Sequence, residues 1–277
     1  MMRILLVFAG ALAAAAFATA QTITAFRIGY LYDLTQTSGS GSSAGSTPYG
    51  FFAEVVGSSF SGTYQFTTPG GSASSPQPLA DDEGDKHFEI AEVFADTTAL
   101  YAAYNTGNYV FDIPNTNLSN TAPDQLTLTL NDTFANAFSI TNGTWSGGKL
   151  LIDPTQAYTI TFDSFAGMVD GVDVIVLGID AGYDDFSSSS ATTSFLIPAN
   201  SFSLAPGQTT SAELVFAKVV DVDNSLGSLT LSGGTYATIV TFQIQAIPEP
   251  STYAAIFGGL ALAGVMLHRV RRKARAA

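Results

Sequence analysis

The chain contains no cysteine, only two histidines and only one tryptophan. Without cysteine it has no disulfides, no thiolate metal ligands and no cysteine nucleophile. One histidine, His268, belongs to an apolar C-terminal segment, so a Ser-His-Asp site would have to use His87, which stands beside Lys86 in a charged segment. Carboxylate pairs carry no weight in a chain with this many acids. We therefore predict a protein that is not an enzyme.

Positive charge is also scarce, with 10 Lys and Arg against 23 Asp and Glu and a formal net charge of −13. Six of the basic residues stand close to the two ends of the chain. Between residues 21 and 247, four basic and 22 acidic residues remain, which gives a formal charge near −18. A surface this negative keeps a protein soluble and repels nucleic acid and anionic lipid. We expect no nucleic-acid partner.

The C-terminal segment, residues 247–277, has three parts in a fixed order. It begins with Pro248, Glu249 and Pro250, whose two prolines favour an extended, accessible backbone. An uncharged apolar run follows, and the segment ends in a basic tip that includes Arg269, Arg271 and Arg272. We predict a membrane-spanning helix over residues 252–268, with the basic tip in the cytoplasm. Its glycines are ordinary in membrane helices, where they let another helix approach closely. A buried core helix and a permanent, uncleaved anchor are the alternatives.

The N-terminal segment, residues 1–20, has the pattern of a secretory signal peptide. Arg3 supplies the positive start, and Ile4 to Phe17 supply the apolar run. Ala18 and Ala20 form a small-x-small cleavage site, which places the mature start at Gln21. We therefore expect export through the Sec translocon, with an uncleaved membrane anchor as the alternative.

The Pro-Glu-Pro, the apolar helix and the terminal arginine cluster together resemble the PEP-CTERM sorting domain of Gram-negative bacteria. The resemblance implies recognition by exosortase and cleavage near Pro248–Pro250. It also implies a single-pass inner-membrane intermediate with a cytoplasmic C-terminus, and delivery of the preceding domain to the cell envelope or the exterior, often in bacteria that produce exopolysaccharide. The resemblance covers only residues 247–275.

The region between the two segments predicts a mainly β fold, because apolar and polar residues alternate with the period of a half-buried strand. The expected strands are Ala25–Asp33, Tyr49–Val56, Phe60–Thr67, Tyr109–Ile113, 126–130, 158–162, Val172–Ile179, Ser211–Val220 and 236–244. One amphipathic helix is expected near residues 90–105, ending in a glycine cap at Gly107, and a flexible loop is expected over Thr37–Thr47.

These elements suggest an N-terminal β-rich region, residues 21–120, and a C-terminal Ig-like antiparallel β-sandwich, residues 121–246. One extended sandwich with an inserted helix is the alternative. The middle of the chain is also similar to paralogous PEP-CTERM envelope ectodomains, through Phe51-Phe52-Ala53, Gly107-x-Tyr109-x-Phe111, Asn142-Gly143-Thr144-Trp145, Ile197-Pro198-Ala199 and Leu204-Ala205-Pro206-Gly207. No activity is implied by that similarity.

Two weak ligand signals remain. Three acidic clusters offer the oxygen ligands that Ca²⁺ favours, around 81–85, around 180–185 and at 221–224. Only the third, with Asp221, Asp223 and Asn224, has ligand-like alternation. None has EF-hand spacing, and we expect no cofactor. Trp145 stands in a glycine-rich stretch, where it either stacks on a sugar or closes one edge of the sandwich.

We expect a non-catalytic envelope or extracellular-matrix protein, structural or associated with exopolysaccharide. A carbohydrate-binding or polysaccharide-processing protein is the alternative, and a membrane-anchored sensor ranks third.

Overall fold

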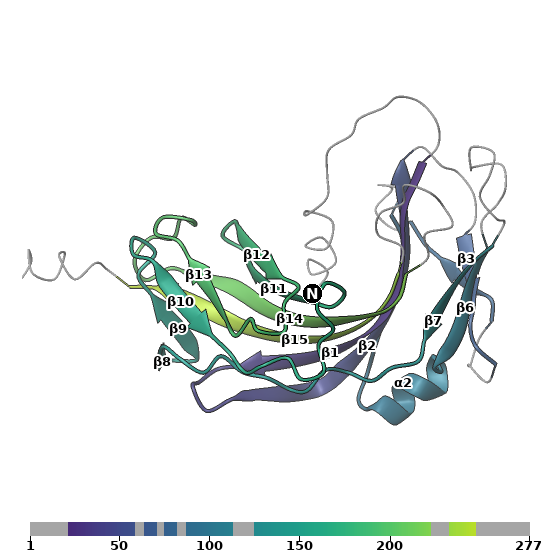
Figure 1. Ribbon diagram of the computed structural model, residues 1–277, viewed down its shortest axis with the longest axis horizontal. Helices are drawn as coiled ribbons and strands as arrows, with labels where there is room; N and C mark the ends of the chain where they lie inside the picture. Colours follow the sequence, from purple (N-terminus) through teal and green to yellow (C-terminus); the bar gives the residue numbers. More distant parts are fainter. Residues whose placement is uncertain are drawn as a thin grey trace, which may run out of the picture.

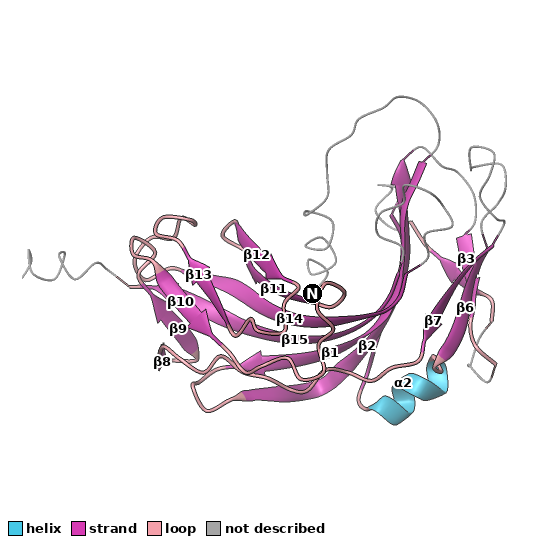
Figure 2. Cartoon of the chain, in the orientation of Figure 1, coloured by secondary structure: helices cyan, strands magenta, loops and turns pink. Residues whose placement is uncertain are grey.

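The computed structural model describes residues 22–58, 64–70, 75–81, 87–112, 125–222 and 233–247, and these residues are mainly β (Figures 1 and 2). The prediction of a mainly β fold is therefore confirmed. The strands are β1 Thr22–Gln36, β2 Ser42–Ser58, β3 Tyr64–Thr67, β4 Gln77–Leu79, β5 His87–Phe94, β6 Gly107–Asp112, β7 Gln125–Leu130, β8 Thr144–Ser146, β9 Lys149–Ile152, β10 Tyr158–Thr161, β11 Val174–Ile179, β12 Tyr183–Ser187, β13 Ser194–Ile197, β14 Thr209–Val222 and β15 Gly233–Ala246. The helix α2 spans Thr97–Ala103.

A nine-stranded sheet forms the base of the molecule, in the order β12-β11-β14-β15-β1-β2-β5, with β8 and β9 attached beside β15. The expectation of purely antiparallel sheets is wrong at two places, because β15 pairs in parallel with both β1 and β9. Parallel pairing needs a long connection, and almost the whole described chain separates β1 from β15. The remaining sheets are β4-β3-β6-β7 and the pair β10-β13.

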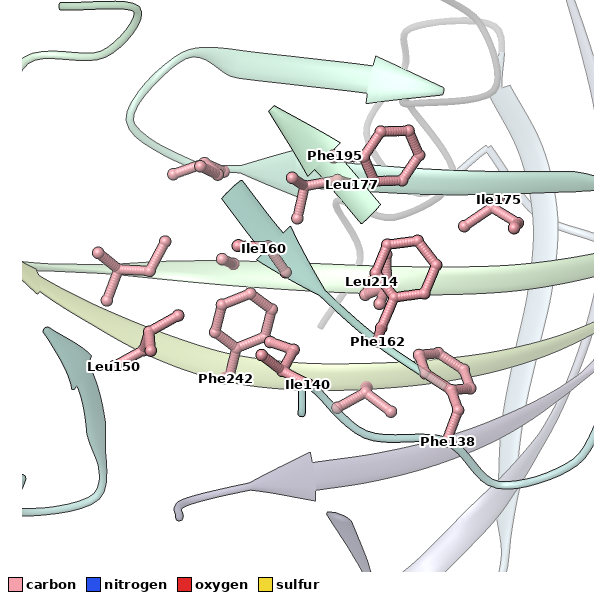
Figure 3. Packing of buried hydrophobic residues seen from close by; sticks show 14 of the residues in the cluster. Phe138, Ile140, Leu150, Ile160, Phe162, Ile175, Leu177, Phe195, Leu214 and Phe242 are labelled. Atoms are coloured by element: carbon pink, nitrogen blue, oxygen red, sulfur yellow. The ribbon is translucent and has the colours of Figure 1, made fainter. Parts of the chain in front are cut away.

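Two hydrophobic clusters pack on one face of this sheet, which we call the covered face. The first joins β1 and β2 to β3, β6, β7 and α2, and Phe51 stacks on Tyr104 at 3.8 Å within it. The second joins β11, β14 and β15 to β9, β10 and β13 (Figure 3). Because β1 and β15 contribute side chains to both clusters, these two strands link the cores.

The predicted regions 21–120 and 121–246 share both larger sheets. Strands β1, β2 and β5 of the first region lie in the large sheet with β11, β12, β14 and β15 of the second. The residue 120/121 boundary falls between β6 and β7, which are hydrogen-bonded neighbours. The two hydrophobic clusters, by contrast, divide largely along the chain.

The prediction of a helix near residues 90–105 is wrong at its start, because residues 87–94 form β5 and pair along their whole length with β2. Ile90 and Phe94 both pack against the first cluster, and residues four apart share a face in a strand as well as in a helix. Val93 would lie on the same face only in a helix, and its side chain is 56% exposed. Asp96 caps the shorter helix by accepting a hydrogen bond from the Ala99 backbone N–H at 2.8 Å.

Two smaller expectations also fail. Residues 42–47 of the predicted loop belong to β2, and Thr35 and Gln36 of β1 pair with Ser43 and Ser42. Gly107 is not the helix cap; Tyr104 takes that position, and Gly107, with φ of +140°, begins β6. In both cases the residues are glycine or small polar residues, which are typical of loops, but their backbones pair in strands.

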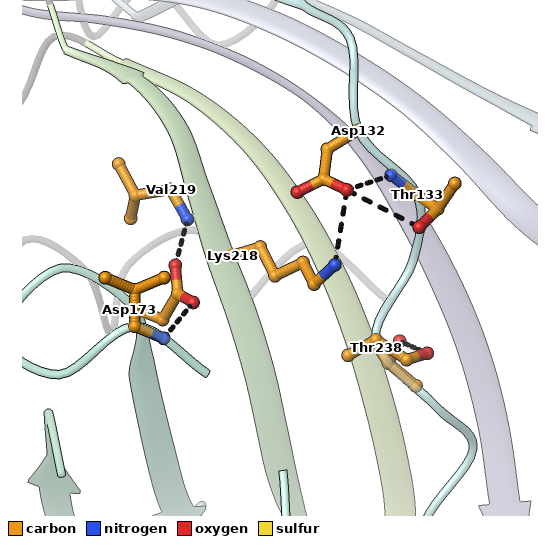
Figure 4. Close-up of polar contacts among 8 residues, drawn as sticks. Asp132, Thr133, Asp173, Lys218, Val219 and Thr238 are labelled. Carbon is orange, nitrogen blue, oxygen red and sulfur yellow. Dashed lines mark hydrogen bonds and ion pairs between the residues drawn. The ribbon is translucent and has the colours of Figure 1, made fainter. Parts of the chain in front are cut away.

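The segment 131–139 has no regular structure and crosses the covered face, held by hydrogen bonds to the sheet. Gln36 is fully buried and pairs with Ile140, donating to its carbonyl at 2.9 Å and accepting from its N–H at 2.8 Å. Thr238 donates to the Ala135 carbonyl at 3.0 Å, and Lys218 forms an ion pair with Asp132 at 3.3 Å (Figure 4). Because its polar groups are paired in this way, an irregular segment can lie over a core.

We expect Phe216→Ala to lower the free energy of unfolding by about 3–5 kcal/mol, because the ring is fully buried and stacks on Phe138 at 3.7 Å. Phe51→Ala in the first cluster should have a similar cost. Since β1 and β15 connect both clusters, each variant should shift one common transition in urea unfolding followed by circular dichroism.

The matched control is Leu196→Ala, whose side chain is 57% exposed and should change stability by less than about 0.5 kcal/mol. Two separate transitions, each sensitive to only one phenylalanine, would instead indicate two units that unfold independently.

Candidate functional site

The predicted sorting residues Pro248, Glu249, Pro250, Arg269, Arg271 and Arg272 lie outside the described residues. The signal-cleavage residues Ala18, Ala20 and Gln21 and the predicted membrane helix at 252–268 lie outside them as well. Within the described ranges, no helix has the length and apolarity needed to cross a membrane. The sorting and cleavage sites therefore stay predictions.

Of the predicted Ca²⁺ ligands, Asp221 is described, whereas Asp223 and Asn224 lie outside the described residues. The Asp221 carboxylate accepts a hydrogen bond from the Thr129 backbone N–H at 2.7 Å, which ties β7 to β14. This bond gives Asp221 a structural role. In the part of the chain that the structure describes, no three His, Asp or Glu side chains lie close enough together to hold a metal ion.

Trp145 lies on β8 and is half-buried against the second cluster. Its ring meets Phe242 edge to face, with 6.4 Å between the ring centroids. A methyl group on Gly39 would lie 3.5 Å from Trp145 Cδ1, so the Gly39 backbone passes close to the indole. This packing favours a closing role for Trp145 at the edge of the core over a flat, exposed sugar platform.

The structure places three carboxylates on the face of the large sheet that points away from the two cores, which we call the opposite face. Asp184 and Glu213 flank Gly178 from the two neighbouring strands. A methyl group on Gly178 would lie 3.3 Å from Asp184 Oδ1 and 3.6 Å from Glu213 Oε1, so both side chains lean over the glycine. Asp33 lies one row away, paired with Ile239 of β15. We call Asp33, Asp184 and Glu213 the carboxylate group.

Burial and mutual repulsion shift the acidity of this group. Burial, reinforced by the charges of Asp180, Asp33 and Asp184, raises the pKa of Glu213 to about 7. Burial also raises the pKa of Asp33 to about 6, and one Asp33 carboxylate oxygen is buried without a hydrogen-bond partner among the described residues. Burial and then Asp180 raise the pKa of Asp184. Glu213 and Asp33 therefore hold their protons more tightly than ordinary carboxyl groups, and a nearby cation would favour their ionised forms.

Sequence reasoning found only part of this group. It singled out residues 180–185 as an acidic cluster, but it missed Asp33 and Glu213, which are far apart in the chain. The alternation of residues along each strand could have indicated which face these carboxylates occupy. Asp33 precedes Leu34, and Glu213 precedes Leu214, and both leucines are buried in the second cluster. Each carboxylate therefore lies on the other face of its strand. Only the strand order places those faces side by side.

Comparison with known proteins adds no family to these observations. No protein-family model matches the chain, and no curated protein matches it.

The raised pKa values predict that stability falls as pH rises. A carboxyl group whose pKa is higher in the folded state holds its proton more tightly there, so its contribution is present below the unfolded pKa of ~4 and is lost through the folded values of about 6 to 7. We expect the thermal unfolding midpoint to fall between pH 5 and pH 8. Glu213→Gln should flatten that profile, which calorimetry across this range would measure.

Asp112→Asn serves as the matched control, because Asp112 is an exposed residue of β6 and its removal changes the net charge equally. If the two variants flatten the profile by the same amount, general charge repulsion rather than the carboxylate group sets the pH dependence.

Proposed function

We propose that the chain is a non-catalytic protein of the cell envelope or extracellular matrix, exported by its N-terminal signal and sorted by its C-terminal segment. The observation that carries this proposal is the order of the three tail parts, in which Pro248, Glu249 and Pro250 precede an apolar run and a basic tip. Exosortase is the proposed processing partner, and exopolysaccharide is the proposed surrounding material.

The fold supports this reading in one respect. The described strands begin at Thr22 and end at Ala246, so they lie between the two proposed cleavage sites. Because β1 and β15 run in parallel, the export segments attach at opposite ends of the large sheet. Removing both would leave the paired strands of the domain intact.

A structural role also fits the chemistry of the domain. Its proposed architecture is an Ig-like sandwich, in which the smaller sheets cover one face of the large sheet. The mature region would carry a formal charge near −18, which keeps a displayed domain soluble and separate from anionic surfaces. A raised pKa at Glu213 is not by itself evidence of catalysis. A general acid acts together with a second group, such as a carboxylate held at a set distance across the bond to be cleaved.

Localisation of variants in a PEP-CTERM-sorting bacterium tests the proposal. The full chain should reach the envelope or exterior with its tail removed, which mass spectrometry of the C-terminal peptide would show. Deletion of residues 247–277 should leave the domain soluble in the periplasm.

A second variant separates sorting from simple anchoring. Replacing Pro248, Glu249 and Pro250 by alanine preserves the apolar run and the basic tip, so it should leave an uncleaved, membrane-bound protein. If the deletion variant reaches the same destination as the full chain, the sorting proposal is wrong.

A further inference from the structure

The opposite face of the large sheet carries an apolar strip, formed by Val176, Val215, Ala217, Ala237 and Ile239. These side chains are 0–7% exposed, and Leu31 and Val174 of the same sheet pack against them. Every member of this cluster comes from the large sheet, whereas the smaller sheets and α2 pack on the covered face. The strip is therefore a second apolar surface of the sheet, distinct from the cores.

Strand register arranges this face in parallel rows. One row consists of Val174, Ala217, Ala237, Leu31, Gly50 and Val93. The next consists of Phe186, Val176, Val215, Ile239 and Asp33. The third contains Asp184, Gly178, Glu213 and Thr241. Two adjacent apolar rows thus lie on one side of the acidic row. The rows end at the exposed side chains of Val93 and Phe186, which are 56% and 59% exposed.

A partner that fits this surface must offer an apolar stretch next to positive charge. A second copy of the described domain does not supply it. Arg27 and Lys218 already form ion pairs with Glu54 and Asp132. Lys149 adjoins Leu150, which is buried in the second cluster, so no exposed apolar stretch lies beside its charge. Within the chain, positive charge adjoins a long apolar run in only two places, residues 1–20 and residues 253–275.

The order of residues distinguishes these two segments. Along β1 from Thr22, the apolar rows at Leu31 and Ile239 come first, and the acidic row follows. Residues 1–20, followed backwards from Thr22, present the apolar run first and then Arg3 and the α-amino group. β15 ends beside the acidic row, and the C-terminal segment that follows it begins with the apolar run. If this segment lay along the sheet, its apolar run would face the acidic row, and its basic tip would face the apolar rows.

The length of the N-terminal segment also matches the distance along β1 from Thr22 to Asp33. The eleven residue-to-residue steps of extended strand from Thr22 to Asp33 span about 36 Å. In a helical conformation the run Ile4–Phe17 spans about 21 Å, and four extended residues before Thr22 add about 14 Å. Arg3 therefore reaches the level of Asp33 when the run lies along β1.

We propose that residues 1–20 of the uncleaved chain dock on the opposite face, with the apolar run on the strip and Arg3 and the α-amino group at the carboxylate group. The strip is then covered in the precursor, and removal of the segment uncovers it. This inference rests on the proposed function only for the removal step, since docking is a property of the uncleaved chain.

Disulfide cross-linking tests the docking, because the chain has no cysteine of its own. The full chain is expressed without export, and intact mass confirms that residues 1–20 are retained. The pair Ile4→Cys and Thr241→Cys leaves Arg3 and all three carboxylates in place, and Thr241 of β15 lies in the acidic row beside Glu213. This pair should form an intramolecular disulfide under mild oxidation, detected by non-reducing electrophoresis and peptide mass spectrometry, and the bond should not form in urea.

Two comparisons make this result specific. The pair Arg271→Cys and Thr241→Cys reports docking of the C-terminal segment and should cross-link several-fold less. In the Ile4–Thr241 cysteine pair, a further Glu213→Lys change should reduce the cross-linking yield about fivefold, the effect of losing one partly exposed charge pair. Asp112→Lys, which changes the net charge equally, should not. Glu213→Gln serves as the milder change if the lysine variant does not fold.

Each other outcome overturns the proposal. A stronger cross-link from Arg271 identifies the C-terminal segment as the occupant, a disulfide between two chains identifies a second copy, and no cross-link shows that residues 1–20 do not dock. Because localisation is measured separately, a failure of docking leaves the sorting proposal intact, and a failure of sorting leaves the docking intact.

Discussion

The parallel pairing of β1 with β15 is the interaction on which the rest of the structure depends. It joins the first and last described strands over ten residue pairs, from Arg27 with Gly233 to Gln36 with Phe242. Both strands contribute to the two hydrophobic clusters, so the pairing connects two cores that lie mostly in different halves of the chain. Because this contact closes almost the whole described chain, its loop-closure entropy is large, and the apolar burial along both strands must offset it.

That constraint explains why the central strands are apolar on both faces. Tyr236 and Phe242 of β15 face the cores, while Ala237 and Ile239 face the opposite side. Small residues on the opposite face, such as Gly178, leave room for neighbouring side chains to lean inward. The edge strand β12 keeps charge and exposure instead, with Asp184 and Phe186 exposed. The acidic row thus lies near the end of an apolar surface, where carboxylates still reach solvent.

Much of the strand content follows from local pattern. The nearly all-apolar run at 172–179 predicts a strand buried on both faces, and residues 175–179 of β11 are buried. The segment 90–94 misleads because Ile90 and Phe94 share a face in either conformation, and only pairing with β2 decides. The carboxylate group could be predicted only in part, since nothing local relates Asp33 to Glu213. Their proximity requires the order of β1, β15 and β14, which comes from contacts across the whole chain.

The scarcity of basic residues in the domain explains the raised pKa values of the carboxylate group. Two of the few basic residues between 21 and 247 are already paired with carboxylates, and Arg27 holds the fully buried Glu54 at 2.7 Å. A domain with so little positive charge does not neutralise this partly buried carboxylate group from its own surface, so the pKa values of Asp33 and Glu213 shift upward instead. The basic residues that could neutralise it stand at the ends of the chain, next to apolar runs. If both ends are removed, as we propose, the chain loses these counter-charges, and protonation is then the means by which the domain keeps this surface stable.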